Sequence, residues 1–259
     1  MVGIDIKGKI ERNVRQAVEE FEAREDIVTP FADPVIAYVN ARDTIFNMLF
    51  DKQLTEHPKN IYRPGNTLIL HFVPFAEDIP KSNIGGATVS PQWRRAVIEA
   101  SWLSMKINRV IRQTLGIVGR LSSLLNTQLD WNEETYQAEW SHKLAAYAAG
   151  MGELGPAGSF HTKDGSFGCL GSIITDGKYC EEVEITDQQQ LESIYENILT
   201  SCCYQGAKNV SCSEEMIKAC PGEAISHSGI DRAKCQKYCK TIDEYIPSPD
   251  VCGKCFSFK

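Results

Sequence analysis

The chain has 259 residues, of which 42% are hydrophobic and 24% charged, a composition that is ordinary for a soluble globular protein. Its formal net charge of −7 argues against a nucleic-acid-binding surface, which is usually basic. No apolar run reaches the roughly 18 residues of a spanning helix, and the polar N-terminus lacks the apolar centre of a secretory signal. We therefore expect a cytoplasmic protein with no membrane and no nucleic-acid partner.

The first third of the chain predicts two helices, a loop and a strand. Apolar residues at helical spacing predict an amphipathic helix over residues 5–25. Residues 34–50 are predicted to form a second helix, because their leading proline is accepted in a first turn. Residues 57–66, with two prolines and a glycine, are expected to be a loop. The β-branched run TLILHFVPF, residues 67–75, predicts a buried strand.

The rest of the main body mixes helices with strands. A long helix is predicted from Pro91 to near Gly116, and we assign its tryptophan and methionine stripe to core packing. SHKLAAYAAGMG predicts a further helix, CLGSIITD a strand, and CEEVEITD a candidate second strand. The segment QQQLESIYENILT predicts a short helix before the tail. This order, mixed rather than strictly alternating, favours the α+β class.

Eight of the ten cysteines lie beyond residue 200. In a cytoplasmic chain, clustered thiols more often bind metal than form disulfides, and thiolates are the ligands of iron–sulfur clusters. Cys220 is followed by Pro221, the dipeptide that closes a bacterial ferredoxin run. Eight thiolates suit two four-cysteine [4Fe-4S] sites. The eight are Cys202, Cys203, Cys212, Cys220, Cys235, Cys239, Cys252 and Cys255.

In a two-cluster ferredoxin, the cysteine before proline crosses to the other cluster. Applied here, that rule gives one ligand set of Cys220, Cys235, Cys252 and Cys255. The remaining set is Cys202, Cys203, Cys212 and Cys239. The run is irregular, since Met216 stands four residues before the Cys-Pro pair, where a cysteine is usual. A four-cysteine zinc site is the alternative, but Cys-Pro followed by an Ala-Ile strand favours iron–sulfur.

Residues 140–176 carry a resemblance to a known family. Their alanine-rich helix, the AGMG-x-x-G run and LGSIITD resemble the same stretch in epoxyqueuosine reductases and reductive dehalogenases. The resemblance implies a nitroreductase-like mixed sheet flanked by helices, which binds a corrinoid (cobalamin) over residues 1–190. It also implies a docked, bacterial-ferredoxin-like iron–sulfur module over residues 191–259. The corrinoid contacts that it implies are Gly150, Gly152, Gly155, His161, Leu170, Gly171, Ser172 and Thr175.

In that family an acid or phenol before the alanine-rich helix donates a proton near cobalt. An ungapped count places Tyr136 there, and a tyrosine with a pKa near 10 is protonated at neutral pH. Asp130 and Glu134 are nearby acids. A structural tyrosine at a helix boundary is the alternative for Tyr136, and a helix C-cap followed by a tight loop is the alternative for the glycines.

These features predict an oxidoreductase similar to the cobalamin-dependent reductases. An external donor of flavodoxin or ferredoxin type would reduce two [4Fe-4S] clusters, and these would reduce the corrinoid for chemistry on a small-molecule substrate. The alternatives are a corrinoid-processing protein that carries cobalamin as cargo or serves a corrinoid protein, and an electron-transfer ferredoxin without corrinoid. Flavin is a less favoured cofactor. The acidic chain, without helical repeats after the cysteines and without a twin-arginine leader, argues against tRNA and organohalide substrates.

Overall fold

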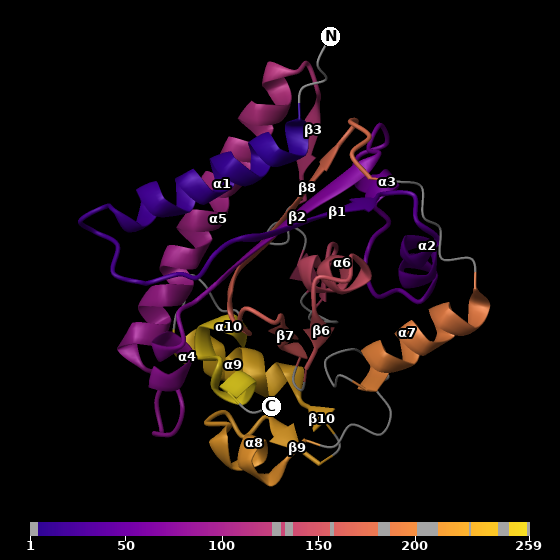
Figure 1. Ribbon diagram of the computed structural model, residues 1–259. Helices are drawn as coiled ribbons and strands as arrows, with labels where there is room; N and C mark the ends of the chain where they lie inside the picture. Colours follow the sequence, from indigo (N-terminus) through magenta and orange to yellow (C-terminus); the bar gives the residue numbers. More distant parts are fainter. Residues whose placement is uncertain are drawn as a thin grey trace.

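The computed structural model describes residues 5–125, 131–132, 137–155, 158–180, 187–200, 212–227, 229–242 and 249–257. It is an α+β fold in which helices cover both faces of a four-stranded antiparallel sheet (Figure 1). The predicted class is therefore confirmed. Within the described ranges, no helix has the length and apolar character needed to cross a membrane.

The central sheet has the strand order β1-β2-β8-β3. Its strands are β1 (Val35–Asn40), β2 (Thr67–Pro74), β3 (Ser122–Leu124) and β8 (Gly168–Thr175). Every residue of β2 is buried, as its apolar sequence predicts, and β2 pairs antiparallel with both β1 and β8. Successive β2 side chains point to opposite faces, so this one strand contributes to two cores.

The predicted helix over residues 34–50 is wrong in its first half. Residues 35–40 form β1, and the helix α2 (Thr44–Asp51) begins only after Asp43, whose side chain accepts a hydrogen bond from the Ile45 amide. The sequence VIAYV is rich in β-branched residues, and pairing with β2 satisfies its backbone groups. The proline at position 34 therefore precedes a strand rather than a first helical turn.

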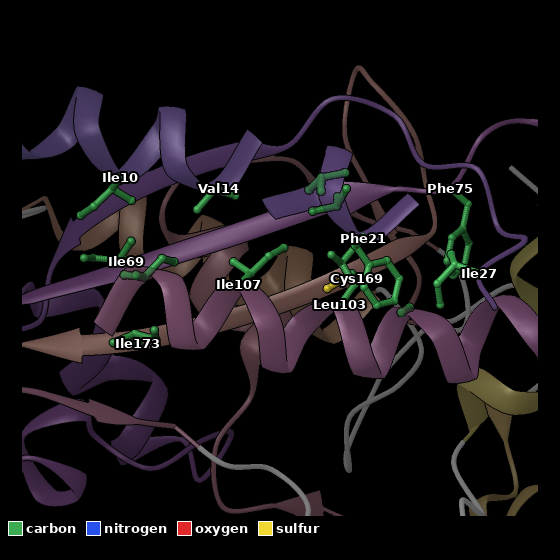
Figure 2. Packing of buried hydrophobic residues seen from close by; sticks show 14 of the residues in the cluster. Ile10, Val14, Phe21, Ile27, Ile69, Phe75, Leu103, Ile107, Cys169 and Ile173 are labelled. Carbon is green, nitrogen blue, oxygen red and sulfur yellow. The ribbon is translucent and has the colours of Figure 1, made fainter. Parts of the chain in front are cut away.

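One face of the sheet is covered by α1 (Ile6–Glu22) and α5 (Pro91–Ile117), both close to their predicted bounds. Figure 2 shows apolar side chains from these two helices meeting Ile69 of β2 and Ile173 of β8. Helix α5 starts sharply, because the Ser90 hydroxyl accepts from the Trp93 amide and proline occupies the first turn. A short helix, α4 (Asp78–Ser82), precedes it.

The stripe of α5 that was predicted to pack in the core is Val97, Trp102, Ile107, Ile111 and Leu115, and most of it does. Ile107, Ile111 and Leu115 are fully buried, and Val97 is partly buried against the same core. Trp102 is the exception, at 37% exposed, and Met105 is 63% exposed. The neighbouring Leu103, fully buried, takes the core position that was expected of Trp102.

The other face carries α6 (His142–Ala148), α2, α3 (Pro58–Ile61) and α7 (Gln188–Thr200). The short helix α3 falls within the segment that was expected to be loop. Two small antiparallel pairs accompany this layer, β4 (Trp131–Asn132) with β5 (Gln137–Ala138), and β6 (Glu153–Leu154) with β7 (Phe160–His161). The candidate strand over residues 180–187 lies almost wholly outside the described residues.

The C-terminal part contains α8 (Glu214–Ala219), β9 (Ile225–Ser226), β10 (Gly229–Ile230), α9 (Arg232–Ile242), α10 (Pro249–Cys252) and a 3₁₀ helix (Lys254–Ser257). It has a small core of its own, made of Cys212, Met216 and Ile225. Figure 1 shows these elements gathered at the end of α5 that lies near α4.

Candidate functional site

Four tail cysteines form one electrostatic group, although they lie on separate elements. Cys220 ends α8, Cys235 lies in α9, Cys252 ends α10, and Cys255 lies in the 3₁₀ helix. Burial raises the pKa of Cys255 well above its ordinary value, and the other three sulfurs raise it further. Burial likewise raises the pKa of Cys252 to about 11. Cys220 and Cys235 thus act electrostatically on both Cys252 and Cys255, and the ligand set that the crossover rule gives stays a prediction.

The backbone around these sulfurs supplies donors for negative charge. The Ala224 amide donates to Cys220 Sγ at 3.3 Å, which holds the turn after the Cys-Pro pair against the sulfur. A backbone amide in the Cys-Gly-Lys-Cys segment also favours the thiolate of Cys252, by lowering its pKa. Amide donors of this kind stabilise sulfur that carries negative charge and so offset the effect of burial, which disfavours the thiolate.

The other predicted ligand set is only partly described. Cys212 and Cys239 are both buried, and Met216, which replaces a cysteine of the usual run, packs beside Cys212. Cys202 and Cys203 lie outside the described residues. Among the described residues, the six described cysteines of the tail form no disulfide with one another. Across the described part of the chain, no three His, Cys, Asp or Glu side chains are grouped as ligands of a single metal ion.

The Cys252–Cys255 segment is fastened to the main body. Buried Asn83 donates from Nδ2 to the Cys252 carbonyl at 2.9 Å, and Lys254 Nζ donates to the Asn83 carbonyl at 2.9 Å and to the Gly85 carbonyl. Gly253 lies against the Trp93 ring, since a Cβ placed on it would be 2.2 Å from a ring carbon. The thiols therefore stand beside the N-terminal end of α5.

An aromatic contact continues from this junction toward the glycine segment. The rings of Trp93 and Phe167 have centroids 5.3 Å apart, and those of Phe167 and His161 are 6.3 Å apart. Phe167 packs against the main core and also against the small core of the tail. The cysteine group and the segment around β7 are therefore linked through side chains in contact.

Gly150 caps helix α6 in a Schellman arrangement. Its φ of +68° is left-handed, its amide donates to the Tyr147 carbonyl at 2.9 Å, and the Met151 amide donates to the Ala146 carbonyl at 3.0 Å. No atom lies within 4 Å of a Cβ placed on Gly150. The C-cap alternative for this glycine is therefore what its backbone adopts.

Three of the other predicted cofactor glycines pack against histidines. A Cβ on Gly152 would be 2.1 Å from the His161 carbonyl oxygen, and a Cβ on Gly155 would be 2.1 Å from His161 Nε2. A Cβ on Gly171 would be 2.4 Å from His71 Nε2. Their missing side chains make room for protein atoms.

The polar residues of this region are bound to one another. His161 contacts the hydroxyl of Ser159 through Nε2 at 2.6 Å and that of Ser166 through Nδ1 at 2.8 Å. Ser172 Oγ accepts from Trp140 Nε1 at 3.0 Å and lies 2.7 Å from His142 Nδ1. Loss of solvation, followed by the proximity of His71, lowers the pKa of His142 to about 3.

The remaining predicted residues lie along β8 or beyond the described ranges. Leu170 is half-buried and packs against the core on the α6 face. Thr175 is buried, and its hydroxyl donates to the Leu121 carbonyl at 2.8 Å. Tyr136, the predicted proton donor, lies outside the described residues, as do Asp130 and Glu134.

His71 is a buried polar residue that sequence reasoning missed. It sits in the middle of β2, and its Nε2 donates to Asn108 Oδ1 of α5 at 3.0 Å. Its Nδ1 is buried and meets no hydrogen-bonding partner among the described residues. Burial lowers its pKa to about 4. A histidine within an otherwise apolar strand was the available signal.

No protein-family model matches the sequence, and no curated protein has a significant match to it. Among solved structures, an epoxyqueuosine reductase with a tRNA-Tyr epoxyqueuosine-modified tRNA stem loop matches at 13% identity with a TM-score of 0.50, over 97% of this chain and 64% of that one. The epoxyqueuosine reductases of Bacillus subtilis and Streptococcus thermophilus each match at 14% identity with a TM-score of 0.48, over 97% and 95% of this chain and 64% of theirs. The chain thus spans less than two thirds of these proteins, and the first match shows a shared fold.

The expectation that no nucleic acid is involved is contradicted. The solved structure that reaches a TM-score of 0.50 holds a tRNA stem loop. The expectation rested on the net charge of the whole chain, which averages over the surface. Charge is felt locally, because at physiological salt its influence falls off within about 8 Å. A net charge of −7 therefore says little about any one face.

Proposed function

We propose that this protein is an iron–sulfur oxidoreductase with an epoxyqueuosine-reductase-like fold, which reduces a modified nucleoside in an RNA stem loop. The observation that carries the redox part is the electrostatic effect of Cys220, Cys235 and Cys252 on the Cys255 thiol. The RNA part rests on the shared fold with a reductase that holds a tRNA stem loop.

The residues around the four thiols fit a [4Fe-4S] cluster. They are cysteines from two ends of the module, Cys252 is buried and the other three are partly buried, and a backbone amide points at the Cys220 sulfur. Such a cluster supplies one-electron transfer. The chain's own residues would bind it, exclude water and set its charge environment, to which the Lys254 ammonium, beside Cys252, contributes. We extend the proposal to a second cluster on Cys202, Cys203, Cys212 and Cys239.

The route for electrons into the main body would begin at the contact between Gly253 and Trp93. From there Phe167 and His161 are in ring contact, and His161 lies within the glycine segment. Because close packing holds the thiols against the body, the transfer would take place within a single chain. The division into residues 1–190 and 191–259 belongs to the proposal.

A corrinoid as electron acceptor is supported by the resemblance in sequence and by the shared fold. The described residues do not supply the glycine cradle that it requires, since Gly152, Gly155 and Gly171 are each filled by a histidine. No step is therefore derived through a corrinoid. Titration of the purified protein with hydroxocobalamin decides the matter. Tight retention with a shifted visible spectrum supports a corrinoid site, and absence of retention removes cobalamin from the proposal.

Iron and sulfide analysis of anaerobically prepared protein tests the cluster. About four irons per chain are expected for one cluster and about eight for two. The double variant C252S/C255S should lose about four irons, while C180S, which alters a cysteine beside Thr67 in the main body, should keep the full content. Zinc in place of iron, or equal iron in both variants, would contradict the proposal.

The RNA part is tested separately, with an epoxyqueuosine-containing stem loop as substrate. Iron-loaded protein and a chemical reductant should convert the epoxide, and C252S/C255S should not. Iron-loaded protein that neither binds nor converts the stem loop would leave the clusters in place but refute RNA as the substrate.

A further inference from the structure

An open groove lies between the C-terminal half of α5 and the edge strand β3. Its cavity volume is about 510 Å³. None of the tail cysteines or the predicted corrinoid residues lines it. The argument uses Met105, Asn108, Arg109, Arg112, Arg120, Leu121 and Leu124. We call it the arginine groove.

The arginine groove concentrates positive charge in an acidic chain. Arg109 and Arg112 are one turn apart on α5, so their guanidinium groups share a face, and neither makes an ion pair with a described residue. Like charges at this spacing repel each other, and an anion bound between them would relieve the repulsion. Arg120, just beyond the end of α5, hydrogen-bonds to the side chain of Tyr179, which directs its guanidinium.

The same groove exposes apolar surface. Met105 is 63%, Leu121 66% and Leu124 42% exposed, although residues of this type are mostly buried. Asn108 adds an amide whose Oδ1 is fixed by His71. Cations, exposed apolar side chains and an amide in one groove match a ligand with an anionic group on a flat, partly apolar body.

We propose that the arginine groove binds an organic phosphate ester of mononucleotide size. Its phosphate would lie between Arg109 and Arg112, which offer fork-shaped donors suited to phosphate oxygens. Its ring would lie over Leu121 and Leu124. The volume lies within the range of about 300–1,000 Å³ that is usual for small-molecule sites, which favours a discrete ligand over a nucleic-acid strand. This site is independent of the proposed reductase activity.

Calorimetric titration of the full chain with AMP tests the proposal. Wild-type protein should bind AMP at one saturable site, adenosine should not bind there, and inorganic phosphate should bind more weakly than AMP. The variant R109A/R112A should weaken AMP binding by about tenfold or more, because two charged hydrogen-bond donors are lost. The variant R42A/R63A removes two exposed arginines elsewhere and should bind AMP as the wild type does.

A second variant tests the ring contact. L121N alters a mostly exposed side chain and should weaken AMP while leaving inorganic phosphate unchanged. The proposal is overturned if wild-type protein shows no saturable AMP binding, if R42A/R63A loses as much affinity as R109A/R112A, or if phosphate binds as tightly as AMP. It is also overturned if an RNA stem loop occupies the groove while AMP does not.

Discussion

Asn83 donates a hydrogen bond from Nδ2 to the carbonyl oxygen of Cys252 at 2.9 Å, across 169 residues of sequence. The same asparagine is fully buried, accepts from the Ser90 amide through Oδ1, and accepts from Lys254 Nζ through its own carbonyl. One side chain thereby joins the start of α5 to the last pair of cysteines. Replacing it removes the two side-chain links.

The variant N83A should lower the free energy of unfolding by about 1–3 kcal/mol, because buried partners lose their hydrogen bonds. Limited proteolysis should also release the C-terminal segment earlier. Denaturant unfolding measures the first effect. N60A is the control, since Asn60 is exposed and bonds only locally to Glu56. Equal stability of N83A and N60A would contradict this role.

Gly253 should resist substitution for two reasons, a left-handed φ of +58° and the Trp93 ring beside it. Gly119 has a φ of +69° with no atom within 4 Å of a placed Cβ. G119A should cost about 1–2 kcal/mol from backbone strain, and G253A about 1–3 kcal/mol more, because the rigid ring cannot yield. Thermal unfolding of the two variants separates strain from steric overlap. The argument fails if they are equally stable.

His71 should make the fold less stable in mild acid. Its folded-state pKa of about 4 lies below the usual 6.5, so below pH 6.5 the unfolded chain takes up the proton first. The stabilisation of the fold that depends on neutral His71 is complete above pH 6.5 and is lost as the pH falls toward 4. It amounts to about 3 kcal/mol in total. His142, with a pKa of about 3, acts in the same direction.

Urea unfolding between about pH 7 and about pH 5 measures this slope. H71Q should make it shallower by up to about 1.4 kcal/mol per pH unit, the value for one proton. H227Q serves as the comparison, because His227 is exposed and meets Glu214 at the surface. If H71Q retains the wild-type slope, the histidine is not held neutral by burial.

Gly171 is expected to serve packing against His71. G171A would place a methyl group 2.4 Å from His71 Nε2, and should destabilise the fold by about 1–3 kcal/mol. G116A, near the end of α5 with open space around it, should instead stabilise by about 0.5–1 kcal/mol. In thermal unfolding, the melting temperature of G171A should fall below that of the wild type and that of G116A should rise above it. If G171A is as stable as the wild type, Gly171 is not required for packing against His71, and its position can serve a bound ligand instead.

The sequence predicted those elements whose signals are local. Ser90-Pro91 marks the start of α5, and the apolar run 67–75 marks β2. It mistook β1 for helix, because the proline signal is the same at either kind of start and the pairing with β2 is distant in sequence. The buried face of α5 was predicted correctly at Ile107, Ile111 and Leu115, but Trp102 was expected in the core where Leu103 lies.

The candidate site rests on two sequence signals of different kinds. The crossover rule predicts which four thiols share a cluster, since it encodes how a ferredoxin chain crosses over, and that ligand set stays a prediction. The glycine motif gave positions without saying what would fill them, and His161 and His71 fill three of them. The arginine groove left no motif, because Arg109 and Arg120 become neighbours only when β3 folds back along α5.

Phe167 packs against the main core on one side and against Cys212, Met216 and Ile225 on the other. Two cores that share a side chain cannot melt independently. Withholding iron during expression should therefore depress the melting temperature of the entire chain in a single transition, rather than freeing a loose tail from an intact sheet. Oxidation of the sulfurs should likewise lower the stability of the whole chain, and not only that of the C-terminal part.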